Sequence, residues 1–168
     1  MEPIRVLIAD DHMVVRKGIQ MIIGTEPAIQ LVGEANDGES AVRQVKQLQP
    51  DVVLMDLVMP RKNGIEATTE IKRDYPQVKI IVLTTFEHND QINAAMEAGA
   101  DGYLLKDADG EALLQAIKAT RRGDVVSLDS RVARHLFQEP LPYVDQPDCK
   151  RLTEREREVL QLVAGGLS

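Results

Sequence analysis

Five polar side chains that could do chemistry stand at the ends of short apolar runs. They are Asp10 and Asp11 after residues 4–9, Asp56 after residues 52–55, Thr84 after residues 80–83 and Lys106 after residues 103–105. If these runs are parallel strands of one sheet, all five side chains project from its carboxyl edge, where open α/β sheets bind ligands. Three carboxylates, one hydroxyl and one ammonium would then share a pocket.

That set of groups predicts a site that binds a hard cation and carries a phosphoryl group. Asp10, Asp11 and Asp56 offer only oxygen ligands, which select Mg²⁺ or Mn²⁺ rather than zinc or copper. Asp56 is the candidate nucleophile, because a carboxylate can form an aspartyl phosphate. Lys106 would pair with one phosphoryl oxygen, and Thr84 would donate a hydrogen bond to another.

Each of these residues also has an ordinary explanation. An aspartate at the end of a strand often caps a helix or forms a turn, and a single lysine is usually a solvated charge. His12, directly after the acidic pair, is expected to serve local packing or the start of a helix. The pocket is favoured because all five polar residues occur at strand ends in the required order.

The residues beside the candidate nucleophile favour a switch over an enzyme with turnover. Phosphatases that form an aspartyl phosphate usually carry a second acid two residues after the nucleophile, and here that position is Val58. Without a general acid or base the phosphoryl group should persist. Val58 and Phe86, both apolar, cannot position an attacking water, so slow loss of phosphate is expected. A Mg²⁺-dependent phosphohydrolase remains the enzymatic alternative.

The elements that must position these residues alternate in type along the chain. Strands are predicted at residues 4–9, 29–32, 52–55, 80–83 and 103–105, with amphipathic helices after each of them, the fourth at about residues 90–98. Five βα units therefore fill residues 1–123. Right-handed crossovers favour an α/β fold with a doubly wound, five-stranded parallel sheet of order 2-1-3-4-5.

The composition changes beyond residue 123. Residues 124–149 contain three prolines and are predicted to be an interdomain linker, in which residues 129–137 could form a short helix. Residues 150–168 begin with a capping box, Thr153 and Glu156, ahead of an apolar helix face. A lone helix cannot bury its own apolar face, so a second, all-α domain is predicted to begin here and to be cut off.

Bulk composition excludes several classes of protein. The net charge of −7 has the wrong sign for a chain built mainly to hold nucleic acid. The single cysteine, Cys149, excludes an internal disulfide and a cysteine metal cluster. No apolar stretch approaches the roughly 18 residues of a membrane span, and the N-terminus lacks the layout of a signal peptide. A cytoplasmic protein without a membrane segment is expected.

Two motifs together resemble a known family. Asp10-Asp11, Asp56 with the following Met59-Pro60 and Gly64, Thr84 and Lys106 resemble the receiver domain of bacterial two-component response regulators over about residues 4–122. The segment Leu-Thr-Glu-Arg-Glu-Arg-Glu-Val-Leu at residues 152–160 resembles the first helix of a LuxR-type helix-turn-helix domain. The combination is similar to the NarL/FixJ class of transcription factors.

The resemblance implies a role for each site residue. Asp56 would receive phosphate from a sensor histidine kinase. Asp11 and Asp56 would ligate Mg²⁺, with Asp10 acting through water and the backbone carbonyl of Val58 completing the site. Tyr103 matches the aromatic switch position of the family, although an ordinary half-buried aromatic is the alternative. Phosphate would pull Thr84 inward, Tyr103 would follow, and the rearranged surface would promote a homodimer or free the DNA-binding domain.

The resemblance also implies that the full-length protein binds DNA. The recognition helix of the family would lie beyond Ser168, so this chain is not expected to read DNA itself. A stand-alone receiver that acts through protein contacts is a further alternative. The capping box at Thr153 argues against that alternative.

Overall fold

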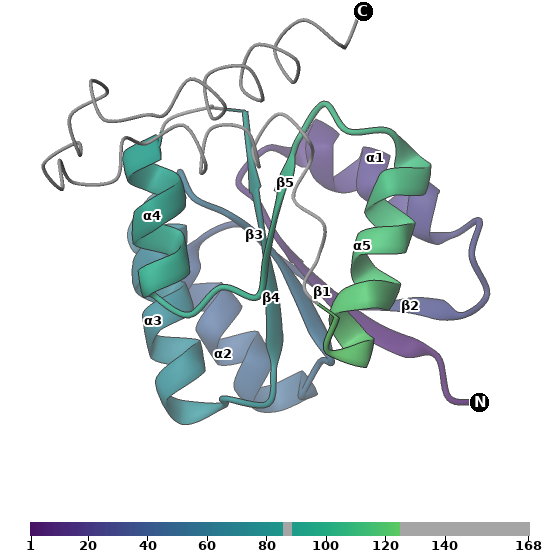
Figure 1. Ribbon diagram of the computed structural model, residues 1–168, viewed down its shortest axis with the longest axis horizontal. Coiled ribbons are helices and arrows are strands. Elements are labelled where there is room, and N and C mark those ends of the chain that lie inside the picture. The colour runs from purple at the N-terminus through teal and green to yellow at the C-terminus, as the bar shows by residue number, and fades with distance from the viewer. Residues whose placement is uncertain (86–88, 125–168) are drawn as a thin grey trace, which may run out of the picture. The chain divides into compact units, whose positions relative to one another are not determined.

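Strands and helices alternate through the part of the chain that the computed structural model describes, residues 1–85 and 89–124 (Figure 1). The elements are β1 Ile4–Ala9, α1 Met13–Ile23, β2 Ile29–Ala35, α2 Gly38–Leu48, β3 Val52–Asp56, α3 Gly64–Asp74, β4 Lys79–Thr84, α4 Asn89–Glu97, β5 Gly102–Leu105 and α5 Gly110–Arg122. The predicted linker, apart from Asp124, and the predicted C-terminal domain fragment lie outside the described residues.

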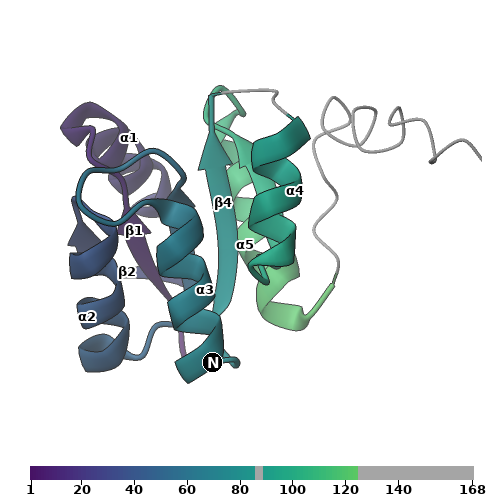
Figure 2. The ribbon, with the colours of Figure 1, turned by 90° about the vertical axis from the view of Figure 1, so that its left-hand side faces the viewer.

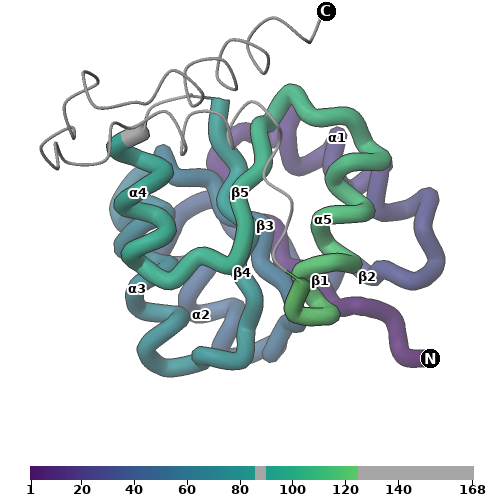
Figure 3. Tube along the Cα trace, viewed as in Figure 1, coloured from purple at the N-terminus to yellow at the C-terminus, as the bar shows by residue number. Residues whose placement is uncertain are grey.

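The five strands form one parallel sheet in the order β2-β1-β3-β4-β5, which confirms the predicted fold and strand order. Helices α1 and α5 cover one face of the sheet, and α2, α3 and α4 cover the other (Figures 1 and 2). In this sheet, whose Cα trace is drawn in Figure 3, β1, β3 and β4 are interior strands and β2 and β5 are the edge strands. A strand covered on both sides is nearly continuously apolar, and β3, which is apolar from Val52 to Met55, is buried at every position.

Two apolar layers hold the sheet between the helices. Alternate residues of the strands face opposite sides, so Val53 and Met55 join the layer under α2, α3 and α4, whereas Leu54 joins the layer under α1 and α5. Because both layers are fully enclosed, the strand ends are fixed with respect to one another. The backbone positions of the polar residues that follow the strands are therefore fixed as well.

Strand β2 is longer than the sequence predicts. It continues past residue 32 to Ala35, because Gly33 to Ala35 pair with Leu7 to Ala9 of β1 after a register shift between Val6 and Leu7. Gly33 and Glu34 interrupt the apolar pattern, which is why periodicity alone ends the strand too early. The shift in register was not visible in the sequence.

Local side-chain chemistry starts the helices near the site. Asp37 caps α2 by accepting a hydrogen bond from the Ser40 backbone N–H at 2.7 Å. Asn63 and Glu66 form a capping box at the start of α3. These caps fix where the loops after β2 and β3 end. No helix among the described residues is long and apolar enough to cross a membrane.

Candidate functional site

The sheet brings the predicted site residues to one edge. Asp10 directly follows β1, Asp56 and Thr84 are the last residues of β3 and β4, and Lys106 directly follows β5. Asp10, Asp56 and Thr84 are buried, and the Lys106 side chain is 10% exposed. The Asp11 carboxylate lies at the rim with 34% exposure. The five predicted residues therefore lie at the same edge of the sheet.

Lys106 bridges two buried carboxylates. Its ammonium nitrogen lies 2.6 Å from Asp10 Oδ2 and 3.1 Å from Asp56 Oδ2, and its backbone N–H donates to the Thr84 carbonyl at 2.8 Å. Burial opposes the charge of Lys106, but the hydrogen bond to Asp10 and the charge of Asp56 outweigh that effect and raise the Lys106 pKa. Lys106 is therefore a cation fixed at the base of the pocket.

Opposing electrostatic effects act on the carboxylate of Asp56. Burial and then repulsion by Asp10 raise the pKa of Asp56, and they prevail over the opposing effects of Lys106 and of the hydrogen bond from the Val58 N–H. That hydrogen bond joins Val58 N to Asp56 Oδ1 at 3.3 Å. The loop after β3 thus turns back over the candidate nucleophile.

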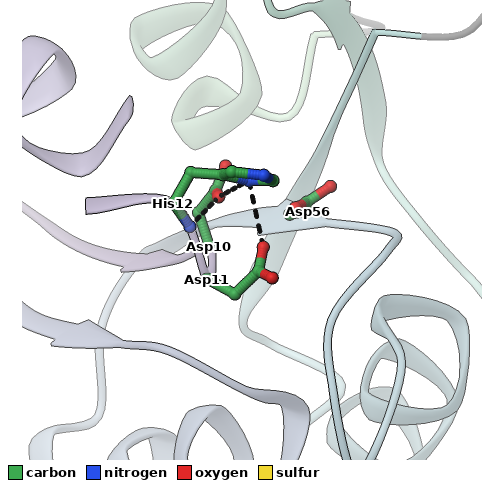
Figure 4. A group of neighbouring side chains, drawn as sticks. All are labelled: Asp10, Asp11, His12 and Asp56. Atoms are coloured by element: carbon green, nitrogen blue, oxygen red, sulfur yellow. Dashed lines mark hydrogen bonds and ion pairs between the residues drawn. The ribbon is translucent and has the colours of Figure 1, made fainter. Parts of the chain in front are cut away.

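His12 belongs to the same cluster, which the sequence did not indicate. Its Nδ1 lies 3.0 Å from an oxygen of Asp10 and 3.0 Å from an oxygen of Asp11, and Figure 4 shows the ring beside both carboxylates. His12 does occupy the N-cap position of α1, as expected, but its side chain makes no capping bond. Its backbone N–H donates to Asp10 Oδ1 at 2.8 Å. An acidic pair followed at once by histidine was the only available signal.

The chemistry of the donor set fits a divalent cation. One ligand atom from each of Asp10, Asp11, His12 and Asp56 can be chosen so that all lie within 4.8 Å of one another. Asp10 Oδ2 and Asp56 Oδ2 are buried, and both contact the ammonium of Lys106. Apart from His12, Lys106 is the only residue in the described part of the chain whose cation contacts any of these three carboxylates, so two negative charges stay uncompensated when His12 is neutral. Mg²⁺ prefers oxygen ligands, which these three carboxylates provide.

Gly64 allows helix α3 to start directly against the site. Its N–H donates to the Leu57 carbonyl at 3.0 Å. A Cβ atom at this position would collide with the backbone carbonyl of Asp56 and would lie 2.8 Å from the Leu57 Cα. A side chain here would therefore push α3 away from the nucleophile.

Tyr103 is fully buried on β5, where it pairs with Val82 of β4, so it is not the half-buried aromatic of the alternative interpretation. It packs in the apolar layer that also contains Ile92 and Ala95 of α4. Thr84 pairs with Leu105, two residues further along β5. The two predicted switch residues thus lie on adjacent strands. Phe86, which the sequence predicts to flank the pocket together with Val58, lies outside the described residues.

Comparison with known proteins identifies the family. Residues 6–118 match the family described as response regulator receiver domain. The transcriptional regulatory protein LiaR of Bacillus subtilis is 43% identical over 97% of this chain and 77% of its own length. The response regulator protein VraR of Staphylococcus aureus is 38% identical over 98% of this chain and 78% of its own length.

A solved structure of the RcsB response regulator from Salmonella typhimurium aligns with a TM-score of 0.76 at 31% identity, covering 100% of this chain and 80% of RcsB. The acidic pocket described above lies within the matched receiver domain. The chain therefore belongs to the response regulators of two-component systems, in the NarL/FixJ family.

Proposed function

We propose that this chain is a phosphorylation-activated response regulator in which Asp56 accepts a phosphoryl group from a sensor histidine kinase. The observation that carries the proposal is the buried Asp56 carboxylate, held next to Lys106 and to the acidic side chains of Asp10 and Asp11. This is the group of residues that aspartyl phosphate chemistry requires. Membership of the response regulator family supports the same role.

In the transfer step an oxygen of Asp56 forms a bond to phosphorus, and the bond from phosphorus to the imidazole nitrogen of the donor breaks. The donor nitrogen leaves with the electron pair. Lys106 is placed to pair with a phosphoryl oxygen, because its ammonium already lies 3.1 Å from Asp56 Oδ2. Thr84, at the adjacent strand end, would donate its hydroxyl to a second oxygen. The chain catalyses only its own phosphorylation.

We assign Mg²⁺ to this pocket. Asp11 and Asp56 would be direct ligands, Asp10 would act through a water molecule, and the backbone carbonyl of Val58 would complete the protein ligands. When bound, the cation neutralises charge that develops on the phosphoryl oxygens. The two uncompensated carboxylate charges of the pocket support a divalent rather than a monovalent ion.

Phosphorylation would be read out by a change in packing. Thr84 and Tyr103 lie on adjacent strands, so a shift of the Thr84 hydroxyl toward the phosphate would change the space around the Tyr103 ring. The surface formed by α4 and β5 would then favour a homodimer. In the full-length protein this would control DNA binding by the helix-turn-helix domain that we place from residue 150, after a linker at residues 124–149. We place the protein in the cytoplasm with its kinase partner.

The nucleophile is tested by incubating the chain with acetyl phosphate and Mg²⁺. We expect wild type to gain the mass of one phosphoryl group, which hydroxylamine then removes as it does from acyl phosphates. Asp56→Asn should gain none, and chelation of Mg²⁺ should abolish the reaction of wild type. Intact-protein mass spectrometry measures all three results.

Asp74→Asn is the matched control, because Asp74 is an exposed carboxylate that pairs with Arg73 on α3, away from the pocket. Its phosphorylation should equal that of wild type. Equal phosphorylation of Asp56→Asn and wild type would refute the assignment of the nucleophile.

A further inference from the structure

The loop that carries Val58 is fixed firmly at both ends. It comprises residues 57–63 and begins where β3 ends at Asp56. At its far end Asn63 forms the capping box of α3: its Oδ1 accepts from the Glu66 N–H at 2.9 Å, and its own N–H donates to Glu66 Oε2 at 3.1 Å. The Gly64 N–H donates to the Leu57 carbonyl across the base of the loop. The middle of the loop must therefore be positioned by other contacts.

Arg61, in the middle of this loop, has an unfavourable backbone conformation. Its φ is 65°, a left-handed value that side chains other than glycine, asparagine and aspartate seldom adopt. Gln49, at the end of α2, is the other such residue among the described non-glycine positions. Backbone strain of this kind persists where the surroundings hold it in place.

The turn between β2 and α2 holds Arg61. Its Nε lies 3.0 Å from Asp37 Oδ2, and its Nη2 contacts the same oxygen. The Gly38 N–H donates to the Lys62 carbonyl at 2.9 Å, and a Cβ atom at Gly38 would collide with that carbonyl. Two loops from neighbouring βα units are thus joined by a side-chain bond and a backbone bond.

Asp37 is a rigid partner for this contact. Its side chain is 6% exposed, and its other oxygen accepts the capping hydrogen bond from Ser40 at 2.7 Å. That hydrogen bond, aided by Arg61, lowers the pKa of Asp37, so the carboxylate is ionised at neutral pH. Arg61 itself is 57% exposed. A half-exposed ion pair adds little to stability, so its main effect is on the position of the loop.

Little freedom remains between Arg61 and Val58. Met59 is buried in the core, and Pro60 has a fixed φ. Only these two constrained residues separate Arg61 from the Val58 carbonyl.

We propose that Arg61 and Asp37 are positioning residues, which hold the loop after β3 so that the Val58 carbonyl meets the cation beside Asp56. This inference rests on the proposed function and extends it to a contact between the β2–α2 and β3–α3 loops. Loss of the contact would weaken Mg²⁺ binding, whereas phosphoryl transfer at saturating Mg²⁺ would be retained. Outer contacts of this kind commonly tune metal affinity.

The test measures the initial rate of phosphorylation of the full chain by acetyl phosphate over a range of Mg²⁺ concentrations. For Arg61→Ala we expect the half-saturating Mg²⁺ concentration to rise about tenfold, the lower end of what outer contacts of metal sites contribute. The rate at saturating Mg²⁺ should stay close to that of wild type. Thermal unfolding followed by circular dichroism checks that each variant is folded.

Three further variants distinguish the effect of the ion pair between Arg61 and Asp37 from the effect of the backbone strain at Arg61. Asp37→Asn keeps an acceptor for Ser40 but removes the charge, so it should match Arg61→Ala. Arg61→Gly tolerates the positive φ but lacks the ion pair, so its Mg²⁺ requirement should lie between those of Arg61→Ala and wild type. Arg61→Lys restores a cation and should recover most of the affinity. Arg73→Ala, which removes an exposed arginine of α3 that pairs with its neighbour Asp74, is the control and should behave as wild type.

An unchanged Mg²⁺ requirement in both Arg61→Ala and Asp37→Asn would overturn the inference. A loss of the saturating rate without a change in the Mg²⁺ requirement would overturn it as well. If wild type is not phosphorylated at all, the proposed function fails. The positioning role is then decided by calorimetric titration of wild type and Arg61→Ala with Mg²⁺ alone, where equal affinities refute it.

Discussion

Lys106 and Asp56 illustrate how single residues set the resting state of the pocket. The ammonium of Lys106 contacts both Asp10 and Asp56, yet burial and the charge of Asp10 still raise the pKa of Asp56. Ionised Asp56 is therefore unfavourable in the folded, metal-free protein relative to the unfolded chain. The carboxylate that is proposed to accept the phosphoryl group therefore lowers the stability of the folded protein.

Asp56→Asn should therefore make the metal-free protein more stable at neutral pH. Because the folded-state pKa of Asp56 is raised, its cost to stability is present above that pKa and disappears as the pH falls toward the ordinary carboxyl value of about 3.9. The difference in melting temperature between Asp56→Asn and wild type should become smaller over the same range of pH. Thermal unfolding in chelator at several pH values measures this.

Asp74→Asn is the control for that comparison. Asp74 is exposed, and its hydrogen bond from Arg73 lowers its pKa, so its replacement should bring no gain in melting temperature. A lower melting temperature of Asp56→Asn than of wild type at neutral pH would show that attraction to Lys106 exceeds the cost of burial.

The sequence predicts the site residues that follow strands but not those that meet across loops. Asp10, Asp56, Thr84 and Lys106 could be found because strand ends converge at a known edge of a parallel sheet. The contact of Arg61 with a residue 24 positions earlier leaves no periodic signal. The position of the His12 side chain likewise depends on the path of the short turn between β1 and α1, which the pattern of apolar residues does not predict.

At the scale of elements, the start of α3 is set by the close approach of its first turn to the end of β3. Gly64→Ala should place a methyl group against the Asp56 carbonyl and destabilise the protein by about 1–3 kcal/mol, as overpacking usually does. It should also slow phosphorylation of Asp56, because the obstruction lies at that residue. Urea unfolding and the acetyl phosphate assay measure the two effects.

Gly18→Ala provides the matched comparison. Gly18 is exposed within α1, and a Cβ atom there would meet nothing within 4 Å. Alanine should therefore stabilise the protein by about 0.5–1 kcal/mol through helix propensity alone. If both glycine variants changed stability equally, the steric account of Gly64 would be wrong.

Elements with uniform patterns were predicted well, and irregular ones were not. The strand predicted at residues 4–9 matches β1, and the helix predicted at about residues 90–98 corresponds to α4, Asn89–Glu97. The end of β2 was missed because its last residues are held by pairing with β1 rather than by their own apolarity. Tertiary pairing thus extended a strand that local pattern would end.

For the molecule as a whole, the proposed switch predicts a change in assembly. With Mg²⁺ and beryllium fluoride, a phosphate mimic, wild type should shift toward a homodimer, and Asp56→Asn should not. Tyr103→Leu keeps an apolar group in the buried site but loses the aromatic ring, so it should bind the mimic and dimerise less. Size-exclusion chromatography with light scattering measures the assembly.

Tyr103→Leu is preferred to Tyr103→Ala, because emptying a fully buried aromatic site costs about 3–5 kcal/mol and would obscure the result. Dimerisation of Tyr103→Leu equal to that of wild type would remove Tyr103 from the switch. Dimerisation of Asp56→Asn in the presence of beryllium fluoride would show that the mimic does not act through Asp56.

The burial of Tyr103 has a practical consequence for optical spectroscopy. The chain contains no tryptophan and three tyrosines, so tyrosine emission is not masked by a stronger fluorophore. Tyr103 lies in the apolar layer beside α4, and Tyr75, the C-cap residue of α3, packs partly buried against the same layer. Replacing Tyr75 and Tyr143 with phenylalanine would leave one tyrosine, at the proposed switch. The ultraviolet emission of that ring would then report its surroundings in real time, without an attached dye.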